Sequence, residues 1–109
     1  MTPFPRAAWA AAALLGLSAP LALAQDANLA PNLARNLAAT CANCHGTNGN
    51  SQGEVKSLAG LPADSIVAAF NAYKAGTLPA TVMHQIAKGY TDDQIKLIAV
   101  YLAAQRPAK

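Results

Sequence analysis

Apolar positions recur at helical spacing in four stretches of the chain, and these stretches predict four helices. In the first stretch, Leu33 and Leu37 lie four residues apart and define one narrow apolar face. The predicted helices span residues 31 to 40 or 41, 62 to 76, 81 to 88 and 92 to 105. No stretch alternates between apolar and polar residues with a period of two, so no strand is predicted. The pattern therefore predicts an all-α domain.

Residue types that begin and end helices mark the boundaries of these stretches. Pro31 and Pro62 suit the first turn of a helix, because a proline there loses no helical hydrogen bond. Gly76 follows the second helix and favours its termination. Thr91 and Gln94 have the spacing of a capping box, in which each side chain bonds to the backbone N–H of the other residue. We therefore expect the last helix to begin at Asp92.

The first 24 residues differ from the rest and have the pattern of a secretory signal peptide. Positive charge is confined to the start, before Ala7, and an apolar run follows as far as Leu17. Ala22 and Ala24 fit the small-x-small rule, which places the cleavage before Gln25. A retained membrane anchor is the alternative, but the run is shorter than the roughly 20 apolar residues that span a bilayer. Export to the periplasm is therefore predicted.

Residues 25–109 are then expected to form one domain, opening with a short flexible lead over residues 25–30 that shows no periodicity. The formal net charge of the whole chain is +3, which is too small to indicate binding to nucleic acid. No stable membrane anchor is predicted for this domain. Its aromatic residues are few, and so short a domain is marginally stable without a covalent or metal staple.

A Cys-x-x-Cys-His motif at residues 41–45 supplies such a staple. Thiols at this spacing add to the two vinyl groups of a haem, and the adjacent imidazole reaches the iron, so the motif predicts covalent attachment of haem c through Cys41 and Cys44 with His45 as proximal ligand. A thiol-exchange site is less consistent with the pattern because no βαβ unit is predicted. A zinc site would need Cys41, Cys44, His45 and a fourth ligand such as His84.

The segment after the motif, residues 46–60, has turn chemistry. Gly46, Gly49 and Gly53 alternate with polar residues, and no apolar period is present. Because this segment follows the haem signature directly, we expect it to form a loop over the edge of the cofactor. Gly46 would allow a close approach of the backbone.

The sixth position on the iron has two candidates. Met83 is the single methionine downstream of the predicted cleavage point, and His84 follows it directly. Neighbouring residues on a helix point about 100° apart, so at most one of the two can reach the iron. Met83 is the favoured ligand and His84 the alternative, since His/Met ligation raises the redox potential and suits electron transfer. A site with neither bound would indicate gas sensing or peroxidase-like chemistry.

These residues resemble a class I c-type cytochrome over the whole predicted mature domain. Residues 58–64 and 79–90 look more narrowly like the cytochrome subunit of flavocytochrome c sulfide dehydrogenase. The resemblance implies a small all-α fold of about four helices around one covalent haem, with Cys41 and Cys44 as attachment points and His45 and Met83 as iron ligands. One departure is visible: Lys56 stands where many class I cytochromes have a proline whose carbonyl oxygen accepts a hydrogen bond from the proximal histidine.

The resemblance also implies a function and a partner. The chain would be a periplasmic one-electron carrier, not catalytic by itself, that takes electrons from a flavoprotein subunit oxidising sulfide. The alternatives are a stand-alone cytochrome serving another respiratory oxidoreductase or oxidase, and a haem enzyme or ligand sensor with an open sixth site. Four lysines could orient a partner by complementary charge: Lys56, Lys74, Lys88 and Lys96. Each of them, taken singly, is equally explained as a solvated surface residue.

Overall fold

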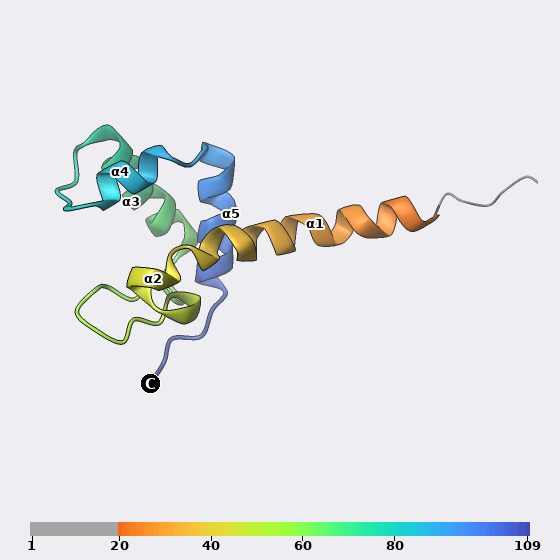
Figure 1. Ribbon diagram of the computed structural model, residues 1–109, viewed down its shortest axis with the longest axis horizontal. Coiled ribbons are helices and arrows are strands. Elements are labelled where there is room, and N and C mark those ends of the chain that lie inside the picture. The colour runs from red at the N-terminus through yellow and green to blue at the C-terminus, as the bar shows by residue number, and fades with distance from the viewer. Residues whose placement is uncertain (1–19) are drawn as a thin grey trace, which may run out of the picture.

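A computed structural model describes residues 20–109, and these residues form helices joined by turns and loops (Figure 1). The elements in chain order are α1 (Pro20–Ala39), α2 (Ala42–His45), the 3₁₀ turn η1 (Thr47–Gly49), α3 (Ala63–Ala75), α4 (Met83–Lys88) and α5 (Asp92–Ala103). None of the described residues forms a strand, and the prediction of an all-α domain is confirmed.

The core lies where three helices meet. The second half of α1 packs across α5, and α3 contacts both α4 and α5 (Figure 1). Ile95, Ile98 and Leu102 supply one buried face of α5, and Phe70 packs against it from α3. The apolar positions that predicted the last helix are therefore the ones that it buries.

The N-terminal boundary of α1 differs from the prediction. The helix begins at Pro20 and runs through Pro31 without ending, so the expected flexible lead over residues 25–30 is wrong. Proline removes one backbone hydrogen bond inside a helix, but the residues before Pro31 are mostly alanine and leucine, which are strong helix formers. In Figure 1 this half of α1 projects beyond the rest of the domain.

The other helix boundaries agree closely with the sequence. Gly76 ends α3 in the left-handed conformation at φ 75°, which glycine adopts without steric cost. Both bonds of the capping box are present at the start of α5: the Gln94 N–H donates to Thr91 Oγ1, and the Thr91 N–H donates to Gln94 Oε1. Helix α4 begins at Met83, two residues later than predicted, and α5 ends at Ala103, two residues earlier.

The predicted signal peptide, residues 1–24, lies mostly outside the described residues, and its cleavage point falls within α1. Its removal therefore stays a prediction. Within residues 20–109, no helix combines the length and the hydropathy needed to cross a membrane.

Candidate functional site

The Cys-x-x-Cys-His motif forms a single helical turn directly after α1. The His45 N–H donates to the Cys41 carbonyl oxygen at 2.8 Å, which closes the turn. Both thiols are free; Cys41 is half-buried against the core, whereas Cys44 is exposed. Burial raises the pKa of the Cys41 thiol above its ordinary value, and the hydroxyl of Thr40 opposes this effect. The helical turn thus presents two thiols and an imidazole within five residues.

The imidazole of His45 is oriented by the loop that follows. Its Nδ1 lies 2.6 Å from the carbonyl oxygen of Lys56. Because a carbonyl oxygen only accepts, Nδ1 carries a proton, and in the neutral imidazole this leaves the lone pair on Nε2. An imidazole held in this way is a preoriented metal ligand. Lysine at position 56 therefore supplies the backbone acceptor that the resemblance assigns to a proline.

The turn at Gly46 brings this loop back over the motif. Gly46 has φ 81°, and a Cβ atom built on it would overlap the Asn50 carbonyl oxygen. The loop is then pinned further along, where the Leu58 and Ala59 N–H groups both donate to the Gly49 carbonyl oxygen. The predicted loop over residues 46–60 is therefore confirmed, with the short turn η1 inside it.

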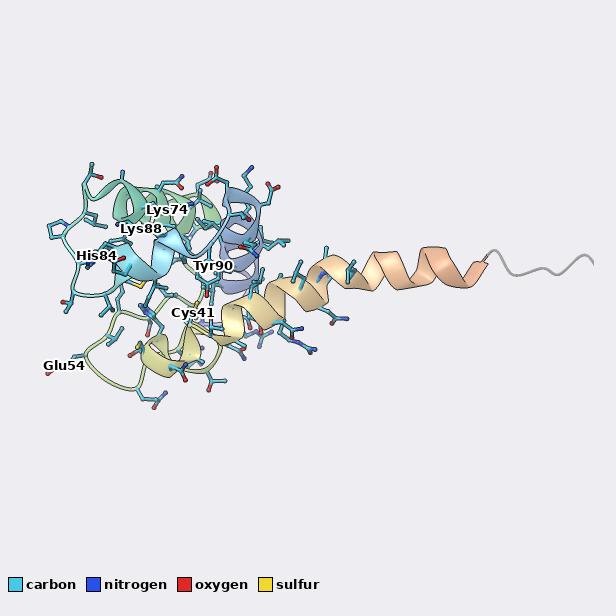
Figure 2. All side chains as sticks on the ribbon, turned by 45° about the horizontal axis from the view of Figure 1, so that its top comes forward. Cys41, Glu54, Lys74, His84, Lys88 and Tyr90 are labelled. Atoms are coloured by element: carbon cyan, nitrogen blue, oxygen red, sulfur yellow. The ribbon has the colours of Figure 1, made fainter. Side chains whose placement is uncertain are left out.

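Met83 and His84 are the first two residues of α4, and both are half-buried. Met83 packs against the same core cluster that Cys41 contacts. The Nδ1 atom of His84 is buried and has no hydrogen-bond partner among the described residues. Figure 2 shows His84 on α4, on the opposite side of the domain from the projecting half of α1. Both candidates for the sixth position therefore lie together at the start of one helix.

The surroundings of these residues suit a flat apolar cofactor. Leu58 and Leu61 from the loop and Val67 from α3 border the core but are only partly buried, as are Cys41 and Met83. Covering half-exposed apolar side chains of this kind with a hydrophobic group stabilises the protein, because apolar surface is removed from water. The preoriented imidazole of His45 and the two free thiols supply the polar chemistry that a haem needs. The donor set and the partly buried apolar side chains at the edge of the core thus fit a covalent haem.

Two alternatives from the sequence find no support in the structure. In residues 20–109, no group of three or more His, Cys, Asp or Glu side chains is close enough to hold a metal ion, so the four proposed zinc ligands do not converge. The same residues form no βαβ unit beside the cysteines, which argues against a thiol-exchange site.

Lys74 has a different role from the one considered for it. Its Nζ donates to the Tyr90 carbonyl oxygen at 2.8 Å and lies 3.5 Å from the Asp92 carboxylate, and its side chain is only 28% exposed. Lys74 therefore joins α3 to the start of α5 within the domain. The sequence pattern did not indicate this contact, because it depends on how α3 packs beside the turn before α5.

Comparison with known proteins identifies the family. Over 72 residues the chain is 32% identical to cytochrome c-553 of Desulfomicrobium norvegicum, which corresponds to 63% of this chain and 90% of that protein. The chain belongs to the c-type cytochromes. No protein-family model matches the chain.

Two further relatives of this cytochrome are informative. The chain is 45% identical over 65 residues to the cytochrome subunit of sulfide dehydrogenase from Chlorobaculum tepidum, and the aligned residues cover 60% of this chain and 59% of that subunit. It is 38% identical over 64 residues to cytochrome c-552 of Acidithiobacillus ferridurans, covering 59% of this chain and 28% of that protein. The cytochrome thus spans less than two thirds of each of these relatives. Membership of the family implies covalently bound haem c and a role in electron transfer.

Proposed function

We propose that this cytochrome is an exported one-electron carrier with one haem c attached to Cys41 and Cys44 and bound at the iron by His45 and Met83. We further propose that it accepts electrons from a flavoprotein subunit of the sulfide dehydrogenase type. The haem would supply a one-electron couple between ferrous and ferric iron, and the residues of the chain would position it and set its potential.

The hydrogen bond between His45 Nδ1 and the Lys56 carbonyl oxygen, at 2.6 Å, carries the proposal. It holds the imidazole in one orientation and leaves Nε2 as a metal ligand in both oxidation states. An imidazole with a fixed direction limits the rearrangement that accompanies a change of charge on the iron, which favours rapid electron transfer.

Met83 is the proposed sixth ligand because its thioether already lies at the edge of the apolar core, where Cys41 also lies. A methionine ligand raises the potential relative to a second histidine. His84 is the competing candidate, and its buried Nδ1 without a partner is the observation that favours it. The two assignments differ in the spectrum that they predict.

Ferric absorption of the haem-loaded protein distinguishes the two ligands. Thioether ligation gives a weak near-red band from charge transfer between sulfur and iron. We expect this band in the native protein, its loss in Met83→Leu and its retention in His84→Ala. Retention of the band in Met83→Leu would rule out Met83 as the ligand. Prompt binding of carbon monoxide by the native reduced protein would instead indicate an open sixth site and a sensor or enzyme.

The export and the partner need separate experiments. Mass spectrometry of protein purified from the periplasm should give an N-terminus at Gln25, and an N-terminus at Met1 would refute the processing. The partner proposal rests on likeness to the cytochrome subunit of sulfide dehydrogenase. Purification from the native host should yield a flavin-containing protein together with the cytochrome, and sulfide should reduce the haem only when that protein is present.

A further inference from the structure

Tyr90 lies in the connection between α4 and α5 and contacts several other elements. Its hydroxyl lies 2.8 Å from Thr40 Oγ1, and its ring packs edge-on against Phe70 with the ring centroids 6.1 Å apart. Its carbonyl oxygen accepts the hydrogen bond from Lys74. In Figure 2, Lys74, Tyr90 and Cys41 follow one another from top to bottom across the domain.

The direction of the bond between Tyr90 and Thr40 follows from the second bond that Thr40 makes. The Thr40 hydroxyl donates to the Leu37 carbonyl oxygen at 2.9 Å, and a hydroxyl has one proton to donate. Tyr90 is therefore the donor and Thr40 the acceptor. A phenylalanine at position 90 would remove the donor and leave the ring in place.

This bond connects the segment just before the Cys-x-x-Cys-His turn with the segment just after α4. On one side, Thr40 directly precedes Cys41, whose N–H donates to the Ala38 carbonyl oxygen. On the other side, Tyr90 is tied to α4 by the bond from its N–H to the Ala87 carbonyl oxygen at 3.3 Å. Helix α4 is only six residues long and begins at Met83. A displacement of Met83 that carries α4 with it must therefore strain or break the contact at Thr40.

We propose that Tyr90 is a positioning residue that holds the methionine-bearing helix α4 against the haem-attachment turn through its hydrogen bond to Thr40. The inference rests on the proposed ligation by Met83. Loss of the bond makes it easier for Met83 to leave the iron, so an external ligand competes more effectively. The apparent affinity of that ligand rises in proportion to the fraction of molecules in the open state.

The expected change is modest because Thr40 is exposed to solvent. One exposed hydrogen bond changes an equilibrium by roughly threefold. Tyr90→Phe should therefore bind imidazole at the ferric iron about three times more tightly than the native protein. Tyr90→Leu also loses the edge-on contact with Phe70 and should show a larger increase, about tenfold.

Tyr101→Phe is a matched control. The Tyr101 hydroxyl donates to Asn48 Oδ1 at 2.8 Å and joins α5 to η1, so this variant also loses one long-range tyrosine hydrogen bond. It leaves α4 untouched. Both variants are loaded with haem and titrated with imidazole in the ferric state. Each variant is also heated, and the temperature at which the near-red band is lost is compared with the temperature at which the helical circular dichroism signal is lost.

The proposal predicts tighter imidazole binding in Tyr90→Phe but not in Tyr101→Phe, with the near-red band of Tyr90→Phe lost before the helices melt. Equal affinities in Tyr90→Phe and the native protein would overturn it, as would an equal increase in both variants, which indicates general destabilisation. Failure of the proposed ligation gives a different result: the native protein then lacks the near-red band, or Met83→Leu retains it.

Discussion

Leu102→Ala tests the burial of the α5 residue that packs beneath the loop that contacts His45. Leu102 is 1% exposed and belongs to the core cluster. Its Cδ2 would lie 3.1 Å from a Cβ placed on Gly49, so it packs beneath the start of the loop. Its carbonyl oxygen accepts the Gly60 N–H at 3.0 Å near the end of the loop. Truncation therefore removes packing from beneath the segment that contains Lys56.

The magnitude follows from the burial. Full burial of a leucine side chain contributes roughly 1.5–3 kcal/mol, most of which alanine forfeits. The cavity left by an incompletely relaxed core raises the total loss to about 3–4 kcal/mol. Val100 on the same helix is 63% exposed, so Val100→Ala should cost at most about 0.5 kcal/mol.

Urea unfolding of the haem-loaded variants, followed by circular dichroism, measures both losses. The midpoint for Leu102→Ala should fall well below that of the native protein with an unchanged slope, and the midpoint for Val100→Ala should stay close to it. A loss below about 1 kcal/mol for Leu102→Ala, or equal losses in the two variants, would refute the placement of Leu102 in the core.

Two further predictions concern the attachment turn. Gly46→Ala places a methyl group against the Asn50 carbonyl oxygen at a positive φ, so we expect the free energy of unfolding to fall by about 2–3 kcal/mol and the yield of covalent haem to fall with it. Gly53→Ala is the control, because no atom outside its chain neighbours lies within 4 Å of the added methyl, and it should match the native protein. Equal yields from both variants would contradict the backbone conformation at Gly46. In full-length chain without haem, iodoacetamide should alkylate Cys44 before Cys41, because burial raises the pKa of the Cys41 thiol and lowers its thiolate fraction at a given pH. The rate at Cys41 should therefore rise as the pH approaches that raised pKa, and equal rates by mass spectrometry would contradict the burial.

The contact between His45 and Lys56 explains how the domain tolerates the departure from proline. The imidazole needs an acceptor at one point in space, and every residue type carries a backbone carbonyl. What proline adds is a restricted φ angle. Here the bonds from the Leu58 and Ala59 N–H groups to the Gly49 carbonyl oxygen restrict the loop just after Lys56. The orientation of His45 thus depends on the closure of the loop as a whole.

Features that depend on neighbouring residues were predicted from the sequence. The capping box at Thr91, the end of α3 at Gly76 and the helical class of the domain each arise from local backbone preferences or from a short apolar period. The attachment motif is also local, because its chemistry needs only two thiols and an imidazole within five residues. The N-terminal limit of α1 was missed because Pro31 permits both a helix start and, at a modest cost, a helix interior.

Contacts between distant segments were decided by the tertiary structure. The bond from Tyr90 to Thr40 joins residues 50 positions apart, and hydroxyl groups that pair across a fold leave no periodic signal in the chain. The half-burial of Lys74 likewise depends on the packing of α3 beside the turn before α5. The sequence by itself indicated which groups would attach a haem, since covalent chemistry depends on residue type and spacing. Only the packed helices determined the orientation of His45 and the contact between Tyr90 and Thr40, because those depend on where the chain returns in space.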